Sequence, residues 1–252
     1  LRFQNLPEHQ QSGQSAESIR SIGKLNMARS KNGYRNFLLA LLALFPTYPF
    51  LVALGPVGQL VELTIGLIVF ATGIRATQGR AHQTLKTIVP CLIVLLFWLL
   101  EQAFAHISWI RIFRAIAFIL FYLLMIWSIS RNVFRSRVIS RTEQLYGAIC
   151  LYLIIGVLFS HIYILIQASN PQAFGCTSVM CQPDFDLKFR TGVHVYFSFI
   201  TLTSVGYGDV IPLTPFAGMI ATLEAIIGQM YSAIVIARLV GLHILDAVSP
   251  RE

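Results

Sequence analysis

The residue types and spacing that could do chemistry occur in one stretch, Thr201-Leu202-Thr203-Ser204-Val205-Gly206-Tyr207-Gly208-Asp209. A column of backbone carbonyl oxygens can replace the hydration shell of a monovalent cation, but successive carbonyls of an ordinary strand point to opposite sides. Turning them all one way requires alternating backbone handedness, which Gly206 and Gly208 permit because positive φ costs glycine little. The stretch therefore predicts a loop that coordinates a cation. Its predicted ligands are the hydroxyl of Ser204 and the backbone of Val205, Gly206, Tyr207 and Gly208.

These residues resemble the signature of the potassium channel family, T-x-T-x-x-G-Y-G-D, and every fixed position of that pattern is matched between Thr201 and Asp209. The resemblance implies a homotetramer, because in this family four chains each contribute a quarter of the filter. It also implies K+ as the permeant ion, no metal other than K+ at the filter, and no cofactor. Relatives usually begin the filter with threonine. Ser204 keeps the oxygen but loses the methyl group that restricts its rotamer.

The composition indicates a membrane protein. The chain has 252 residues, of which 56% are hydrophobic and 12% charged, and a mean hydropathy of +0.68. The net charge of +8 does not indicate nucleic-acid binding, because the basic residues punctuate the apolar runs and do not form one polar face. We expect an all-α membrane protein with six transmembrane helices of roughly 20 residues each, and a re-entrant pore helix and filter loop between the fifth and sixth.

The predicted spans are approximately 37–54, 57–74, 88–104, 112–129, 145–166 and 216–243. Lys and Arg are concentrated in alternate connections, which predicts a multi-pass cell-membrane protein with both termini in the cytoplasm. The expected organisation is a cytoplasmic tail (1–35), a four-helix domain similar to a voltage sensor (36–130), a basic cytoplasmic linker (131–144), the pore domain (145–243) and a short cytoplasmic tail (244–252). The compactness indicates a prokaryotic source. The arginines of the linker could bind anionic lipid headgroups. A role only in determining the membrane topology explains them equally well.

Most residues expected to support the filter lie on the pore helix directly before it, which we predict at about 191–203. Counting from the signature, Tyr196 and Phe197 occupy places where many relatives have a tryptophan pair behind the filter. Tyr196 can still hydrogen-bond Asp209, whereas Phe197 can only pack; ordinary packing of both aromatic residues is the alternative. Thr201 and Thr203 complete this predicted support. Ile200 occupies a place where some relatives have a glutamate that pairs with the acid after the filter, so the resemblance leaves Asp209 without that partner.

The sixth predicted span contains an ionisable residue, Glu224, which we expect behind the filter in a hydrogen bond. Gly228 lies where the family has an inner-helix hinge, and close helix packing is the alternative explanation. The residues predicted to line the cavity share one helical face, with the last two as a gate or, alternatively, as lipid or helix contacts. These are Gln229, Ser232, Ile236 and Val240.

The fourth predicted span has few of the charges that voltage sensing requires. Arg111 and Arg114 begin a stripe at three-residue spacing, but Ala117, Leu120 and Leu123 continue it. One charge that crosses the whole field contributes about 2.3 kcal/mol per 100 mV, and two arginines at the outer edge would cross only part of it. We therefore expect weak or no voltage dependence. The alternative role for the two arginines is to extend to the membrane interface without sensing voltage.

The cysteines divide by their surroundings. Cys176 and Cys181 lie in a polar loop and can form a disulfide if that loop faces an oxidising compartment. Cys91 and Cys150 lie in apolar runs, where cysteine is usually a small buried hydrophobic residue.

The sequence as a whole predicts a potassium-selective channel that is not an enzyme. No His-Glu-x-x-His or Gly-x-Ser-x-Gly motif occurs. A nonselective cation channel would be expected to break Gly-Tyr-Gly, and a transporter would be expected to have a second broken segment in the other half of the chain. A conventional voltage-gated potassium channel and a non-conducting membrane scaffold or sensor with the same fold remain as alternatives.

Overall fold

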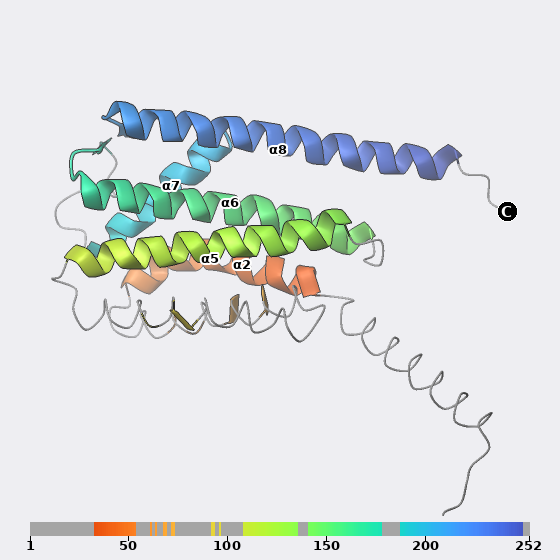
Figure 1. Cartoon of the computed structure of the whole chain (residues 1–252), viewed down its shortest axis with the longest axis horizontal. Helices are drawn as coiled ribbons and strands as arrows, with labels where there is room; N and C mark the ends of the chain where they lie inside the picture. Colours follow the sequence, from red (N-terminus) through yellow and green to blue (C-terminus); the bar gives the residue numbers. More distant parts are fainter. Residues whose placement is uncertain are drawn as a thin grey trace, which may run out of the picture.

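The computed structural model is mostly helical over the part of the chain that it describes (Figure 1). The described residues are 33–53, 61, 64, 68–69, 72–73, 92–93, 96, 108–135, 141–177 and 187–248. The helices are α2 (Gly33–Ala53), α5 (Ser108–Arg135), α6 (Arg141–Ser169), α7 (Leu187–Leu202) and α8 (Pro215–Val248), and the strands are β1 (Phe174–Cys176) and β2 (Val210–Pro212).

Three of the described helices are long and apolar enough to cross a membrane, judged by length and composition. Their apolar segments are Ile112–Arg131 of α5, Thr142–Ser169 of α6 and Pro215–Arg238 of α8, which match the predicted fourth, fifth and sixth spans. Helix α2 covers the predicted first span. The second and third spans lie mostly outside the described residues.

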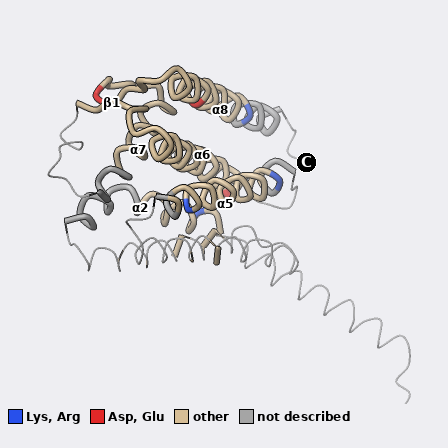
Figure 2. Tube along the Cα trace, turned by 60° about the vertical axis from the view of Figure 1, so that its left-hand side comes forward, with Lys and Arg blue, Asp and Glu red and all other residues tan. Residues whose placement is uncertain are grey.

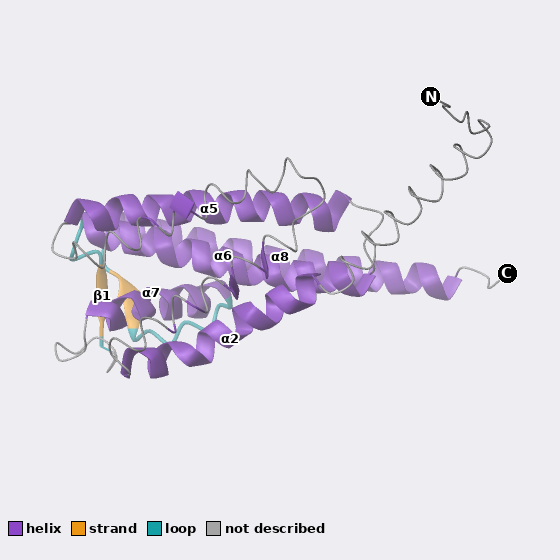
Figure 3. Ribbon diagram, turned by 90° about the horizontal axis from the view of Figure 1, so that it is seen from below, coloured by secondary structure: helices purple, strands orange, loops and turns teal. Residues whose placement is uncertain are grey.

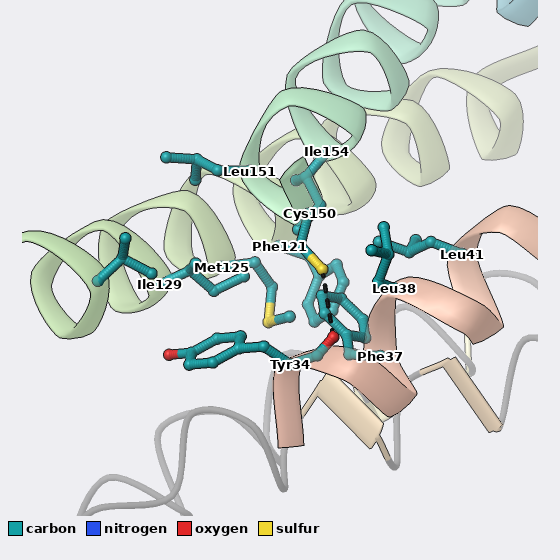
Figure 4. Close-up of a cluster of buried hydrophobic side chains, with 11 residues drawn as sticks. Tyr34, Phe37, Leu38, Leu41, Phe121, Met125, Ile129, Cys150, Leu151 and Ile154 are labelled. Atoms are coloured by element: carbon teal, nitrogen blue, oxygen red, sulfur yellow. Dashed lines mark hydrogen bonds between the residues drawn. The ribbon is translucent and has the colours of Figure 1, made fainter. Parts of the chain in front are cut away.

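Helix α6 connects two separate hydrophobic clusters, and its apolar residues extend around the whole helix, as expected of a helix buried on several sides. Its first half packs against α2 and α5, where Tyr34, Phe37, Met125 and Cys150 form part of a buried cluster (Figure 4). The Cys150 thiol donates to the Tyr34 carbonyl at 3.6 Å and is a free cysteine.

The second half of α6 packs against α7, α8 and the strands. The cluster there includes Phe159, Tyr163, Phe197 and Ala217, all buried. Phe197 meets Tyr163 edge-on at a ring-centroid distance of 4.9 Å. Helix α7 is thereby enclosed between α6 and α8, with which it makes most of its contacts.

The two short strands form an antiparallel pair at the end of the bundle where α7 begins (Figure 3). Phe174, Gly175 and Cys176 face Pro212, Ile211 and Val210, respectively. In sequence, β1 precedes α7 and β2 follows the predicted filter. The all-α prediction did not include these strands. They join the segment after α6 to the segment after the filter.

Helix α5 has one exposed apolar face along its length. Its members recur at steps of three and four, so they share one side of the helix. They are Trp109, Phe113, Ile116, Leu120, Leu123 and Trp127. The described helices contain few charged residues along their length (Figure 2), as a hydrocarbon environment requires.

Element boundaries differ from the sequence-based expectation at two places. Residues 131–135 belong to α5 and 141–144 to α6, so helix occupies both ends of the expected linker 131–144. Arginine is a good helix former and the segment contains no proline or glycine, which explains the extension. Helix α7 begins at Leu187, before the expected start near residue 191.

The first turn of α2 is held by a buried carboxylate on α6. The N–H of Tyr34, the second described residue of α2, donates to Glu143 Oε2 at 2.9 Å. Glu143 is buried, and its position at a helix N-terminus is electrostatically favourable. This contact joins the beginnings of α2 and α6.

We expect Glu143→Ala to destabilise the protein by about 1 kcal/mol, because it removes the acceptor at the start of α2. Thermal unfolding of the purified protein in detergent measures the effect. Glu143→Gln keeps an oxygen acceptor and should lower the unfolding temperature less. Equal unfolding temperatures for Glu143→Ala and the wild type would contradict this role.

Candidate functional site

The loop after α7 has alternating backbone handedness. Ser204, Gly206 and Gly208 have φ angles of 57°, 55° and 78°, whereas Val205 and Tyr207 between them have ordinary φ. Because left-handed and right-handed residues alternate, successive carbonyls can point to the same side. A Cβ atom placed on Gly206 or Gly208 would meet nothing within 4 Å, so these glycines are required by conformation and not by space.

Ser204 is left-handed although its residue type does not predict this conformation. A non-glycine residue in this region costs roughly 1–2 kcal/mol. The backbone N–H of Ser204 donates to the Thr201 carbonyl at 2.9 Å, which closes a tight turn at the end of α7. Serine lacks the β-branch that would make this conformation still more costly.

The last turn of α7 anchors the loop through backbone hydrogen bonds. The Ile200 carbonyl accepts from Val205 N–H at 2.8 Å and from Gly206 N–H at 3.2 Å. Thr203 donates through both its backbone N–H and its hydroxyl to the Phe199 carbonyl, at 3.0 and 2.6 Å. The loop therefore begins at a fixed point on the helix.

Asp209, at the other end of the loop, is held from two directions. Tyr196 Oη of α7 donates to Asp209 Oδ2 at 2.9 Å, and Asp209 Oδ1 accepts from Val210 N–H at 3.0 Å. The Asp209 carbonyl accepts from Thr177 N–H at 2.8 Å, next to β1. Tyr196 also stacks with Tyr207 at 6.5 Å between centroids.

Glu224 lies behind the loop, 0% exposed, where α6, α7 and α8 meet. Its Oε2 accepts from the Tyr163 hydroxyl of α6, and its Oε1 lies 2.5 Å from Ser198 Oγ of α7. Ser198 Oγ also lies 2.6 Å from the Gly156 carbonyl. A hydroxyl has one proton to donate, so both Ser198 contacts are satisfied together when the Glu224 carboxyl is protonated. This cluster joins all three helices.

Gly228 is in close contact with the end of α7. A Cβ atom at this position would overlap the Leu202 carbonyl oxygen, so no side chain fits without a shift of the backbone. The same carbonyl accepts from the Tyr152 hydroxyl of α6 at 3.3 Å. The structure gives Gly228 a packing role and does not test the predicted hinge.

The predicted cavity residues lie along one side of α8. Gln229 and Ile236 are exposed, and Ser232 is half-buried near Tyr152. Gln229 Nε2 donates to Ser204 Oγ at 2.9 Å, a contact between α8 and the loop. The side chain of Val240 lies outside the described part of α8.

The remaining predicted site residues belong to α5 and to the segment between α6 and α7. Arg114 is half-buried on α5, near His161 of α6, and the side chain of Arg111 lies outside the described residues. Cys176 is disulfide-bonded, and its predicted partner Cys181 also lies outside the described residues. Within the part of the chain that the structure describes, no group of three or more His, Cys, Asp or Glu could hold a metal ion.

Comparison with known proteins identifies the segment that contains the loop as similar to ion channels. Residues 147–242, from α6 into α8, match the model of a family described as ion channel. The matched segment contains the loop, Glu224 and Gly228. No curated protein and no solved structure matches the chain. The chain is therefore a membrane protein with an ion channel domain formed by α6, the strands, α7, the loop and α8.

We expect Glu224→Ala to destabilise the protein by about 3 kcal/mol or more, because it leaves a cavity and removes the acceptor for the buried Tyr163 hydroxyl. Glu224→Gln keeps a carbonyl oxygen for Tyr163 and gains an N–H for Ser198, so its unfolding temperature should stay near that of the wild type. Thermal unfolding in detergent compares the two. Equal losses for the two variants would show that the hydrogen bonds do not determine stability here.

We expect Gly228→Ala to destabilise the protein by about 1–3 kcal/mol, since α8 must move away from the Leu202 carbonyl. Gly218→Ala is the matched control on the same helix, because a Cβ atom there would meet nothing within 4 Å. The control should be neutral or slightly stabilising, as alanine favours helix over glycine. If both alanine variants unfolded at the wild-type temperature, the close contact would be unimportant.

Proposed function

We propose that the chain forms a homotetrameric, potassium-selective channel that conducts K+ passively through a filter built from residues 204–208. The observation that carries this proposal is the alternation of φ at Ser204, Gly206 and Gly208 within an ion channel domain. Dehydrated K+ is coordinated by rings of backbone carbonyls in such filters. The chemistry is coordination of an ion, without a cofactor and without making or breaking bonds.

The exposure of the loop in a single chain supports assembly with further copies. Val205 and Tyr207 are 51% and 72% exposed, although both side chains are large and apolar or aromatic. Helix α8 has an exposed apolar face next to the loop that a neighbouring chain would cover. Its members are Phe216, Met219, Leu223, Ile226, Met230 and Ile234.

The charges of α5 support weak or no voltage dependence. Arg114 is followed at three-residue steps by Ala117, Leu120 and Leu123, and the two leucines are on the exposed apolar face. Few charges would therefore move through the field. Arg111 and Arg114 then serve mainly as interfacial anchors.

The proposed topology has both termini in the cytoplasm and the filter mouth outside. With this orientation, α5 ends at the inner surface, where Arg131 and Arg135 suit anionic lipid headgroups. The Cys176 disulfide faces the outside, where oxidising conditions are found, and we assign Cys181 as its partner. Ile236 and Val240 form the apolar constriction at the inner end of the cavity.

A planar bilayer with K+ on one side and Na+ on the other tests the proposal. Purified wild-type protein should give a current whose reversal potential lies close to the K+ limit, with an open probability that changes little with voltage. A reversal potential near zero would contradict potassium selectivity. Absence of current would favour a non-conducting scaffold or sensor.

Gly206→Ala should abolish K+ conduction, because each of four subunits would carry an alanine at a φ of 55°. The unfolding temperature should fall only modestly, because alanine is strained at this φ although its Cβ atom would overlap no neighbouring atom. Gly218→Ala, which has the same free space but lies in α8, should conduct as the wild type does. Selective conduction in Gly206→Ala would argue against a carbonyl filter at this loop.

A further inference from the structure

The amide of Gln229 contacts the residue that the proposed filter uses as its innermost ligand. Nε2 of Gln229 lies 2.9 Å from Ser204 Oγ, and both residues are exposed in the single chain. We propose that Gln229 is a positioning residue that fixes the Ser204 hydroxyl for ion binding. This inference rests on the proposed function of the loop.

The Ser204 side chain needs an external restraint. Its backbone is fixed by the hydrogen bond from Ser204 N–H to the Thr201 carbonyl, but serine has no second substituent on Cβ to restrict χ1. A hydroxyl that rotates freely must lose that freedom whenever it binds an ion. The hydrogen bond from Gln229 removes this freedom in advance, which favours binding.

The hydrogen-bonding capacity of a hydroxyl allows both contacts at once. The Ser204 oxygen has two lone pairs, so one can accept from Gln229 while the other faces a cation. The N–H group of Gln229 is a donor, so it cannot coordinate the cation in place of the Ser204 oxygen. The contact therefore orients the oxygen without occupying its ion-binding side.

The packing of α8 explains why Gln229 can reach Ser204. Its neighbour Gly228 lies against the Leu202 carbonyl, where no side chain fits, so the backbone of α8 comes close to the end of α7. Ser204 is two residues beyond Leu202. The close approach at Gly228 thus brings the next side chain of α8 within hydrogen-bonding distance of the loop.

Block by cytoplasmic Ba2+, a divalent cation close to K+ in size, measures the innermost ion site in planar bilayers. Gln229→Met has a similar length and is a good helix former, but it removes the donor. We expect this variant to weaken Ba2+ block by about fivefold or more, because one ordinary hydrogen bond corresponds to about fivefold and the proposed tetramer loses four. Its unfolding temperature should equal that of the wild type, because Gln229 is exposed.

A double-mutant cycle with Ser204→Thr distinguishes positioning from a general effect of cavity polarity. Threonine carries the γ-methyl group that restricts its own rotamer, so Gln229→Met should weaken block much less in the Ser204→Thr background. Thr222→Val, which removes a side-chain hydrogen bond to the Gly218 carbonyl elsewhere on α8, should leave block unchanged.

Three results would overturn the inference. If the wild type conducts K+ selectively but Gln229→Met shows unchanged or tighter Ba2+ block, then Gln229 does not position Ser204. The proposed function of the loop is not contradicted by that result. If Gln229→Met weakens Ba2+ block equally in the wild-type and Ser204→Thr backgrounds, Gln229 affects block through the polarity of the cavity and not through the Ser204 hydroxyl. A wild type without K+ selectivity overturns the proposed function and this inference with it.

Discussion

The left-handed backbone of the loop after α7 is the constraint that the surrounding contacts of the ion channel domain satisfy. A peptide segment does not keep φ angles of 57°, 55° and 78° at alternating positions without support. Support comes from the Ile200 carbonyl at the start of the loop, which accepts from Val205 and Gly206, and at its end from Tyr196 and from the N–H of Thr177, next to β1. The conformation is therefore imposed by the surrounding helices and strands as much as by the glycines.

Helix α7 transmits this support to the rest of the bundle. It is joined to α6 and α8 through the buried Glu224 and through the Leu202 carbonyl, which contacts both Tyr152 and Gly228. Each contact uses a polar group at a place where most side chains are apolar. An unpaired polar group there would be costly, so the arrangement of the three helices is specified closely.

Much of the site could be predicted from sequence because it depends on local chemistry. The loop, the need for positive φ at Gly206 and Gly208, and the reach of Tyr196 to Asp209 follow from residue type and spacing. The hydrogen bonds of Glu224 agree with the expectation for an ionisable residue within a span, but its partners could not be named. Tyr163 and Ser198 are on other helices, and their contact depends on helix rotation, which the spacing within one helix does not determine.

Most of the features that were missed depend on contacts between distant segments. The β1–β2 pair forms because the segments flanking α7 return to one place, and strands this short have no recognisable alternation. The left-handed Ser204 was missed because only glycine signals this conformation clearly. The bond from Gln229 depends on the close approach at Gly228, and glycine in an inner helix is compatible with either a hinge or close packing.

The exposed face of α5 begins and ends with a tryptophan, and its length carries a consequence for the surrounding lipid. At 1.5 Å per residue, Trp109 and Trp127 are separated by about 27 Å along the helix. Their side chains are 70% and 71% exposed, and tryptophan favours the boundary between headgroups and hydrocarbon. A bilayer with a thicker or thinner hydrocarbon region must deform or tilt α5. Helix α5 packs along α6, and α6 also packs against α7, which carries the loop at its end. A tilt of α5 caused by hydrophobic mismatch would therefore reach α7 and the loop through one helix, α6.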